Sequence, residues 1–550
     1  MKLNEMKLTG IGVSPGVTYG PLHFISKPKF EKPISVSLQK IFAGLNIVAE
    51  YLEDQSKLVT LDVAKEVIEA QSMIARDPEL FETFKTYFPA TGDVSDARDS
   101  IRLCFAGFKD SLKKIGGYFA ERVSDIEEIE QLLFHVLTDL PITQTLITHE
   151  CVVAAEDLSP AETANMNLSF VKGIFVAKGG PTSHTAIVAR NLGIPAVVGC
   201  GNVKVISEST SVLIDGRSGN IFLDPEINLV NELVKKEKNY QKKLLAIKGI
   251  GQLKDKTKIE LLANAGNHAD AVNAHSMGAE GIGLFRTELL YLSQNIAPSI
   301  SEQVNLYSKI FNDFNSKKVI VRTLDAGSDK PLPFLNVEKE ENPALGVRGW
   351  RLFRDHKNVI SDQIKAISIA TENSSCDVWV MAPMIDTVKE VREFVELARS
   401  FGLKKVGVMI ETPAAAILAD KIFAEVDFAS LGTNDLTQYV MAADRLDSRL
   451  SDLTNTWHPS VLRMIQIAGS YAKKMNKPLG VCGEAASDPL LAAVLIGLGV
   501  TSLSMSPYSI REVKGFLSTL SMNKCVEVAS EIVRCADYDQ AMNLARKALI

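Results

Sequence analysis

The sequence lacks the features that mark exported, membrane-embedded and zinc-stabilised proteins. Its seven cysteines are an odd number and form no CxxC pair, which argues against a disulfide framework and a structural zinc site. No apolar h-region follows the start MKLNEMKLTG, and apolar stretches such as residues 492–500 fall short of the roughly 20 residues that a membrane span needs. These absences predict a soluble, cytoplasmic protein without membrane contact.

An excess of positive charge is also lacking. Sixty Lys and Arg residues stand against 66 Asp and Glu residues, so the formal net charge is −6. No global positive field exists to attract phosphate backbones, which argues against nucleic acid as the main partner. The negative charge is concentrated in residues 50–135, which hold 18 acidic and 10 basic side chains, and the rest of the chain carries +2.

The length of 550 residues predicts several domains, since one domain usually takes about 100–200 residues. Residues 35–140 are poor in Gly and place apolar side chains at helical spacing, as in Leu58, Val67 and Ile68, which predicts a helical bundle. Strand-and-turn sequences flank this segment on both sides. We therefore expect the bundle to be inserted into a split α/β domain, residues 1–34 and 141–226.

The second half of the chain repeats short β-branched runs that alternate with helical patterns. A Lys-rich helical linker over 227–257 precedes these runs. The runs are IELLANAG, GIGLFRTE, KVIVRTLDAG, VWVMAPMI, KVGVMIET, FASLGTND, PLGVCGEA and SLSMSP. Eight such units predict a closed parallel (β/α)8 TIM barrel over 258–550. The fold class is thus multidomain α/β.

Most of these runs end in polar or reactive side chains. The residues concerned are Asn264, Arg286, Arg322, Glu411, Asn434, Asp435, Cys482, Ser504 and Ser506. Any one of them is most simply explained as an ordinary polar group at a strand end. Together they indicate an active site, because the carboxyl ends of barrel strands face it.

The sharpest local motif is GGPTSHTAIVAR, residues 179–190. It predicts that His184 lies in the first turn of a helix, where unpaired N–H groups and the helix dipole favour an anion such as a phosphoryl group. A structural or merely exposed histidine after a tight turn is the alternative, and the local sequence leaves it open.

Nine motifs follow one another along the chain between residues 157 and 484. They are DLSPAET (157–163), GGPTSHTAIVARNLGIPAVVG around His184, GAEGIGLFRTE (278–288), VIVRTLDAGSDK (319–330), ENPALGVRGWR (341–351), VMIETPAA (408–415), SLGTNDLTQY (430–439), ADR (443–445) and VCGE (481–484). With them the sequence resembles the phosphoenolpyruvate-utilising phosphotransferases, and among these the Enzyme I family of the sugar phosphotransferase system.

This resemblance implies a two-step transfer, from phosphoenolpyruvate to His184 and then to a histidine of the phosphocarrier HPr. Arg286 and Arg322 would hold the phosphate, and their forked donors suit it. Arg445 would reach the substrate carboxylate, and Asn434 would contact substrate. Structural pairing is the alternative for the arginines, with Glu288 and Asp325 near enough in sequence to be partners of Arg286 and Arg322.

Two further roles concern a metal and a proton. Glu411 and Asp435 follow consecutive strands, and two carboxylates with substrate oxygens suit Mg²⁺; a salt bridge is the alternative. Cys482 would protonate the enolate of pyruvate, since a free thiol with a pKa of about 8.5 is mostly protonated at neutral pH. The other cysteines are expected to be small buried hydrophobes.

Several assignments rest on the resemblance alone. Thr163 would orient His184, although a helix-capping hydroxyl explains it equally well. Residues 35–140 would dock HPr through an acidic face, and the barrel would form a homodimer. The chain departs from the family pattern at Gln71, Pro181 and Ser487, and Leu446 and Asp447 stand where an Asn is expected. These departures bear on carrier preference and rate rather than on the reaction.

Three other functions compete with this interpretation. A phosphoenolpyruvate synthase or pyruvate, phosphate dikinase would need a large ATP-binding domain, and the helical insert shows no Gly-rich phosphate cradle. A nitrogen-related Enzyme I typically adds a sensory domain before the first motif, which here begins at Gly10. An inactive scaffold is least favoured, because the residues named for catalysis are all in place.

Overall fold

The structure is a computed structural model. It describes all residues except 1–5, 26–32, 59–61, 90–91, 116–122, 139–146, 148, 159–162, 164–165, 167, 181–182, 202, 204–205, 207–209, 248, 292–295, 328–331, 336–339, 446–449 and 451. The chain divides into two compact units, Met1–Asn239 and Tyr240–Ile550. Each unit is described by itself below.

The first unit contains an eight-stranded mixed sheet in the order β1-β10-β9-β3-β6-β7-β8-β2. Its strands are β1 (Met6–Thr9), β2 (Ile11–Ser14), β3 (Val17–Ile25), β6 (Cys151–Ala155), β7 (Val171–Val176), β8 (Ala196–Val198), β9 (Ser211–Asp215) and β10 (Asn220–Leu223). β3 and β6 pair in parallel, from Leu22 opposite Val152 to Ile25 opposite Ala155. The helical segment between these two strands is therefore an insertion into the sheet's chain path.

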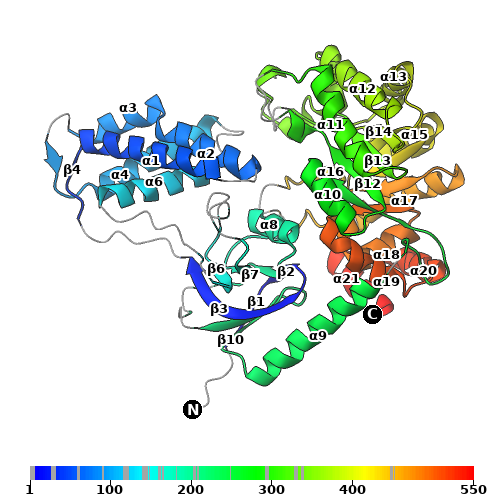
Figure 1. Ribbon diagram of the computed structural model, residues 1–550, viewed down its shortest axis with the longest axis horizontal. Coiled ribbons are helices and arrows are strands. Elements are labelled where there is room, and N and C mark those ends of the chain that lie inside the picture. The colour runs from blue at the N-terminus through cyan, green and yellow to red at the C-terminus, as the bar shows by residue number, and fades with distance from the viewer. Residues whose placement is uncertain are drawn as a thin grey trace. The chain divides into compact units, whose positions relative to one another are not determined.

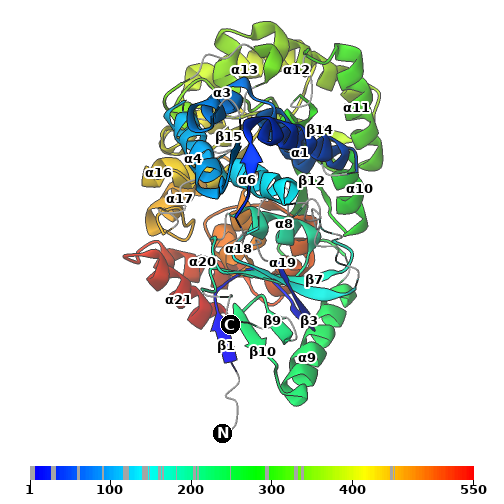
Figure 2. The ribbon, with the colours of Figure 1, turned by 90° about the vertical axis from the view of Figure 1, so that its left-hand side faces the viewer.

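The insertion consists of helices with their own hydrophobic core. They are α1 (Leu38–Leu58), α2 (Asp62–Ala75), α3 (Pro78–Tyr87), α4 (Arg98–Ile115) and α6 (Val123–Leu137), with a two-stranded sheet of β4 (Val36–Ser37) and β5 (Asp93–Val94). The helices run alongside one another (Figures 1 and 2), and Phe84, Phe105, Phe108 and Phe134 are buried between them. The periodicity of apolar residues thus predicted the helices that form.

Two further helices complete the first half of the chain. α8 (His184–Leu192) packs on β2 and β8. It ends at Gly193, whose φ of 66° lies in the left-handed region that glycine adopts without strain. α9 (Ile227–Ala246) is the helix predicted from the Lys-rich stretch, and it spans 20 residues.

The second unit is built on a closed barrel of eight strands in sequence order, and every neighbouring pair is parallel. The strands are β11 (Glu260–Ala265), β12 (Gly281–Arg286), β13 (Lys318–Arg322), β14 (Asp377–Ala382), β15 (Val406–Ile410), β16 (Phe428–Leu431), β17 (Leu479–Val481) and β18 (Ser502–Met505). Seven of them fall within predicted runs, and β14 begins one residue before its run, so the prediction of a multidomain α/β fold with a TIM barrel is confirmed.

Helices surround this barrel (Figure 1). The α-helices are α10 (His268–Ser276), α11 (Ile300–Asp313), α12 (Lys357–Glu372), α13 (Val388–Ser400), α14 (Pro413–Ile417), α15 (Ala419–Glu425), α16 (Thr433–Met441), α17 (Pro459–Lys474), α18 (Pro489–Gly497), α19 (Ile510–Leu517), α20 (Met522–Ile532) and α21 (Tyr538–Leu549). Short 3₁₀ helices lie in the loops: η1 (Glu288–Leu290), η2 (Pro333–Leu335), η3 (Pro343–Leu345), η4 (Gly349–Arg354), η6 (Glu484–Ser487) and η7 (Pro507–Ser509).

The barrel strands are buried on both faces, which explains why their sequences are nearly continuous apolar runs. The larger core lies between strands and helices. A smaller core includes Trp379, Met381, Met409, Phe428 and Cys482. Among the helices in the described part of the chain, none has the length and apolar character that a membrane span requires.

Candidate active site

The carboxyl ends of the barrel strands bring the predicted site residues to one rim. Arg286 and Arg322 are the last residues of β12 and β13, which are neighbours in the barrel. Glu411 directly follows β15, and Cys482 directly follows β17. Asp435 lies four positions beyond the end of β16, in the first turn of α16, so a helix rather than a strand end holds it.

Arg322 is buried and bridges two carboxylates. Its Nη2 lies 2.5 Å from Glu288 Oε1, and its Nη1 lies 3.0 Å from Asp325 Oδ2. The structural pairing that the sequence left open for the arginines is therefore present at Arg322. Arg286 is exposed and has no carboxylate partner among the residues that the structure describes.

Arg348 is a buried member of this cluster that the sequence argument did not select. Its Nη2 lies 3.1 Å from Asp325 Oδ2, and its Nη1 lies 3.1 Å from Asp435 Oδ1. It precedes η4 and follows a long loop, so a search of strand ends could not find it. The only sequence signal is its place in the motif ENPALGVRGWR.

Arg445 approaches the same cluster from the other side of Asp435. Its Nη1 lies 3.4 Å from Asp435 Oδ2, and its backbone N–H donates to Gln438 Oε1 at 3.1 Å. About a quarter of its side chain remains exposed. Asp435 is thus held between Arg348 and Arg445, and the guanidinium of Arg445 still reaches solvent.

Glu411 is the carboxylate of this cluster without an ion-pair partner among the described residues. It is fully buried, and its Oε1 accepts a hydrogen bond from the N–H of Met384 at 2.6 Å. Among the residues that the structure describes, Oε2 has no hydrogen-bond partner, and a Cβ at Gly432 would lie 2.6 Å from it. Burial, and secondly the charge of Asp435, raise the pKa of Glu411 to about 8. The charges of Arg322 and Arg348 act in the opposite direction and only partly offset this rise. Among the described residues, Glu411 therefore has no positive charge paired with it directly.

A cation that prefers oxygen ligands would supply that charge. No group of three or more His, Cys, Asp and Glu side chains in the described part of the chain is arranged to hold a metal. Glu411 and Asp435 are two acidic side chains whose charges interact. Two carboxylates with further oxygens from substrate and water form a common Mg²⁺ site, so the residues present fit that ion.

Cys482 is buried beside this rim and keeps its proton. Its Sγ donates to the carbonyl oxygen of Leu431 at 3.5 Å, and burial raises the pKa of the thiol to about 11. Two neighbours fix the backbone here. Asn264 Nδ2 donates to the carbonyl oxygen of Cys482 at 3.2 Å, and the N–H of Glu484 donates to Asn434 Oδ1 at 3.2 Å. The thiol is an acid held in a defined position.

His184 lies in the first unit as the first residue of α8, as the motif predicts. The side chain of the N-cap residue Ser183 accepts a hydrogen bond from the N–H of Ala186, which fixes the start of the helix. The side chain of His184, and all of Pro181 and Thr182, lie outside the described residues. Thr163 is buried, but residues 159–162 before it lie outside the described part, so its predicted role stays a prediction.

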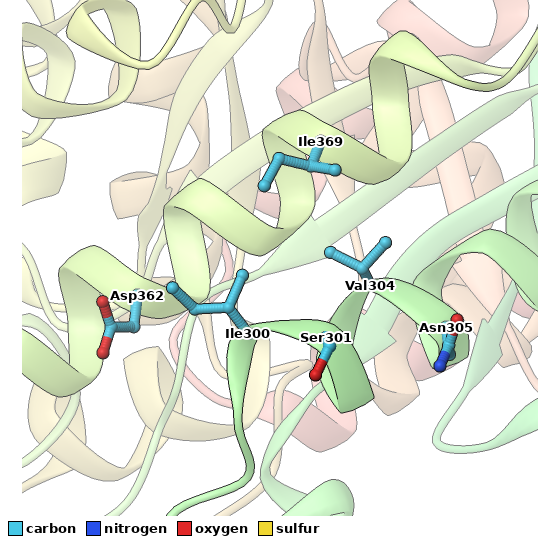
Figure 3. Close-up of a pocket in the computed structure, with 6 residues that line it drawn as sticks. All are labelled: Ile300, Ser301, Val304, Asn305, Asp362 and Ile369. Carbon is cyan, nitrogen blue, oxygen red and sulfur yellow. The ribbon is translucent and has the colours of Figure 1, made fainter.

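A separate surface hollow lies between α11 and α12 (Figure 3). It has a volume of about 690 Å³, and its lining residues are Ile300, Ser301, Val304, Asn305, Asp362 and Ile369. None of the residues of the charged cluster lines it. The hollow is therefore not part of the candidate active site.

The chain is similar to known proteins along most of its length. Three family models match the chain: "PEP-utilising enzyme, N-terminal" over residues 9–122, "PEP-utilising enzyme, mobile domain" over 147–219 and "PEP-utilising enzyme, PEP-binding domain" over 238–522. The last model covers the barrel and its charged rim.

Three curated relatives share the name phosphoenolpyruvate-protein phosphotransferase. The one from Streptomyces coelicolor is 38% identical over 557 residues, which is 99% of each chain. The one from Buchnera aphidicola subsp. Schizaphis graminum is 33% identical and covers 99% of this chain and 100% of its own. The one from Priestia megaterium is 34% identical and covers 94% of each chain.

Proposed function

This chain belongs to the family of PEP-utilising enzymes, and from that premise we propose that it transfers the phosphoryl group of phosphoenolpyruvate to His184 and from there to a histidine of HPr. It is an enzyme of phosphoenolpyruvate-dependent phosphotransfer. The proposal adds the residues, the metal and the acceptor. It gives this chain the role of the first general component of a sugar phosphotransferase system.

One observation carries the proposal furthest: the buried Glu411 carboxylate has an oxygen without a partner in the described part of the chain, and it lies among arginines that are paired with other acids. An uncompensated buried carboxylate is costly unless a cation joins it. We assign Glu411 and Asp435 to hold Mg²⁺. When bound, the ion would neutralise the phosphate and carboxylate oxygens of phosphoenolpyruvate.

The arginines of the rim suit the substrate's two anionic groups. Arg286, exposed at the end of β12, and Arg322, next to it on β13, would bind the phosphoryl oxygens. Arg445, which keeps part of its guanidinium in solvent, would bind the carboxylate. Asn434 would contact substrate from the first turn of α16. Each of these groups adds positive charge or hydrogen bonds where phosphoryl transfer requires them.

The first step forms a bond between an imidazole nitrogen of His184 and phosphorus and breaks the bond between phosphorus and the enol oxygen. The electron pair of that bond stays on the oxygen as the enolate of pyruvate. Cys482 then gives its proton to the methylene carbon, which yields pyruvate. A thiol whose pKa is raised to about 11 carries that proton at neutral pH. The thiolate takes up a proton from water before the next cycle.

The second step passes the phosphoryl group from His184 to a histidine of HPr. The helical insert, residues 35–140, is our candidate docking surface. Its acidic side chains include Glu82, Asp99 and Glu127, which are largely exposed. Such a surface would speed association with a basic carrier, and added salt would slow it.

We also propose that the barrel, residues 258–550, forms a homodimer, which sedimentation at several protein concentrations tests.

Labelled phosphoenolpyruvate tests the proposed function directly. With Mg²⁺, the protein should acquire one acid-labile label and pass it to HPr. His184→Ala should abolish labelling, whereas His149→Ala, which removes an exposed histidine of the same unit, should not. Labelling that requires ATP, or labelling that persists in His184→Ala, would contradict the proposal.

A further inference from the structure

Gln363 is a fully buried amide on α12 that hydrogen-bonds in three directions. Its Oε1 accepts from the N–H of Leu324 at 2.8 Å. Its Nε2 donates to Thr287 Oγ1 at 2.9 Å and to the hydroxyl of Tyr307 at 3.3 Å. An amide is the side chain that can accept and donate at the same time, so this set of bonds matches its chemistry.

The partners of Gln363 lie directly beside the rim arginines. Thr287 follows Arg286 in the chain, and its Oγ1 donates to the carbonyl oxygen of Arg322 at 2.9 Å. Leu324 lies two residues after Arg322. One side chain therefore connects the residues that follow β12 to the residues that follow β13, and these are the strands that carry both arginines.

The network continues into α11, which holds the amide in place. The hydroxyls of Tyr307 and Tyr291 both donate to Gln303 Oε1, at 3.5 Å and 2.7 Å. Gln303 Nε2 donates to the carbonyl oxygen of Pro298 at 3.0 Å. These side chains are buried, so water cannot replace the bonds cheaply. The position of Gln363 is consequently determined from two helices.

We propose that Gln363 is a positioning residue that sets the spacing of Arg286 and Arg322 for the phosphoryl group. The inference rests on the proposed function, since it takes the two arginines as phosphate ligands. Phosphoryl transfer depends on placing charge around the reacting phosphorus, and a displacement of about 1 Å can lower the rate about 100-fold. Gln363 itself touches neither substrate nor metal in this assignment.

Four substitutions separate positioning from simple stability. Gln363→Met keeps the length of the side chain and removes its hydrogen bonds. Thr287→Val keeps the shape and removes the hydroxyl, and Thr287→Ser restores the hydroxyl. Asp362→Asn is the matched control, because Asp362 is the exposed chain neighbour of Gln363 on α12, lines the hollow of Figure 3 and takes no part in the hydrogen bonds described above.

The assay measures two reactions of the full-length protein. For phosphorylation of His184 by phosphoenolpyruvate, we expect kcat/KM to fall about 10-fold to 100-fold in Gln363→Met and Thr287→Val, with part of the loss in KM. The double variant should lose little more than either single one, because both break the same connection. Phosphoryl exchange between His184 and HPr, which needs no barrel arginine, should change less than about twofold in all variants.

Thermal midpoints and controls make the outcome decisive. Thr287→Ser and Asp362→Asn should keep wild-type kinetics. The inference is overturned if Gln363→Met and Thr287→Val lower only the thermal midpoint and leave kcat/KM within about twofold of wild type, or if Asp362→Asn loses as much activity. If Gln363→Met does not fold, Thr287→Val carries the test. Failure of the wild-type protein to accept the label would instead refute the proposed function.

Discussion

Glu411 and Cys482 lie on the same barrel rim, and burial acts on both. For Cys482, a raised pKa means that the thiol retains the proton that it would donate. For Glu411, burial opposes the charge that a metal ligand needs, and the pKa rises to about 8. The same burial therefore has opposite consequences for the two proposed roles. It keeps Cys482 in the protonated form that a proton donor needs, whereas Glu411 needs a bound cation to stay ionised.

Glu411→Gln tests whether the carboxylate of Glu411 helps to hold Mg²⁺. The neutral amide keeps an oxygen for the N–H of Met384 and avoids burying a carboxylate, so the thermal midpoint in EDTA should be unchanged or higher. Phosphorylation of His184 by phosphoenolpyruvate should fall about 100-fold or more, as when a transition-state partner is removed. The rise in midpoint that Mg²⁺ and phosphoenolpyruvate cause should disappear. A variant that keeps this rise would argue against the assignment.

Cys482→Ser tests the proton donor. Because the hydroxyl is a far weaker acid than the thiol, formation of pyruvate should slow by a factor of about 100, whereas exchange of phosphate between His184 and HPr should stay near wild type. In the wild-type protein, the thiol stays protonated below its pKa of about 11. Deprotonation of Cys482 should therefore not lower the rate of single-turnover pyruvate formation up to about pH 10. Equal losses in both reactions would contradict the role.

At the scale of elements, α8 is the helix whose local sequence best explains its proposed role. Ser183 caps the helix that begins at His184, and Gly193 ends it. The cap satisfies one of the otherwise unpaired N–H groups of the first turn. The remaining ones are the groups that would favour a phosphorylated imidazole.

Ser183→Ala should destabilise the start of α8 by about 1 kcal/mol. Hydrogen exchange in the first turn of α8 should speed up, and transfer from His184 to HPr should slow. Binding of phosphoenolpyruvate in the barrel should not change. Ser183→Thr keeps the hydroxyl and is the matched control. If Ser183→Thr slows transfer from His184 to HPr as much as Ser183→Ala does, loss of the helix cap is not the cause.

Strand ends were the most predictable part of the site. Arg286, Arg322, Glu411 and Cys482 were found because a parallel barrel brings the carboxyl ends of its strands together. Arg348 was not found by this rule, because a loop delivers it. The unpaired Glu411 oxygen could not have been predicted either, since it depends on side-chain packing around one buried atom.

At the scale of the whole molecule, both the helical insert and the barrel could be predicted, because their hydrophobic periods differ. The insert repeats apolar residues at helical spacing, and the barrel alternates short apolar runs with helices. The pairing of strands within the mixed sheet could not be predicted from the sequence. β1 pairs with β10 and β3 with β9, and such distant partners leave no local pattern in the sequence.

The three tryptophans, Trp350, Trp379 and Trp457, all lie buried in the second unit, so their fluorescence reports on the barrel. The described residues of the two units form separate hydrophobic cores. In a His184→Ala protein, Mg²⁺ with phosphoenolpyruvate at 100 times its dissociation constant should stabilise the barrel by about 2.7 kcal/mol. The midpoint followed by tryptophan fluorescence should rise. The unfolding midpoint of the first unit, followed by circular dichroism as a second transition, should stay the same. Equal shifts of the two midpoints would contradict the prediction.

The pairing of β3 with β6 has a consequence for the order in which the chain folds. Residues 26–150 separate these neighbours, so at about 5–20 residues per second a ribosome needs roughly 6–25 s between them. The nascent helices of the insert make contacts close in sequence and can complete their core within that interval. The central pair of the sheet closes afterwards, so α8, whose His184 we propose is phosphorylated, packs on the sheet only after the insert, our candidate docking surface, has folded.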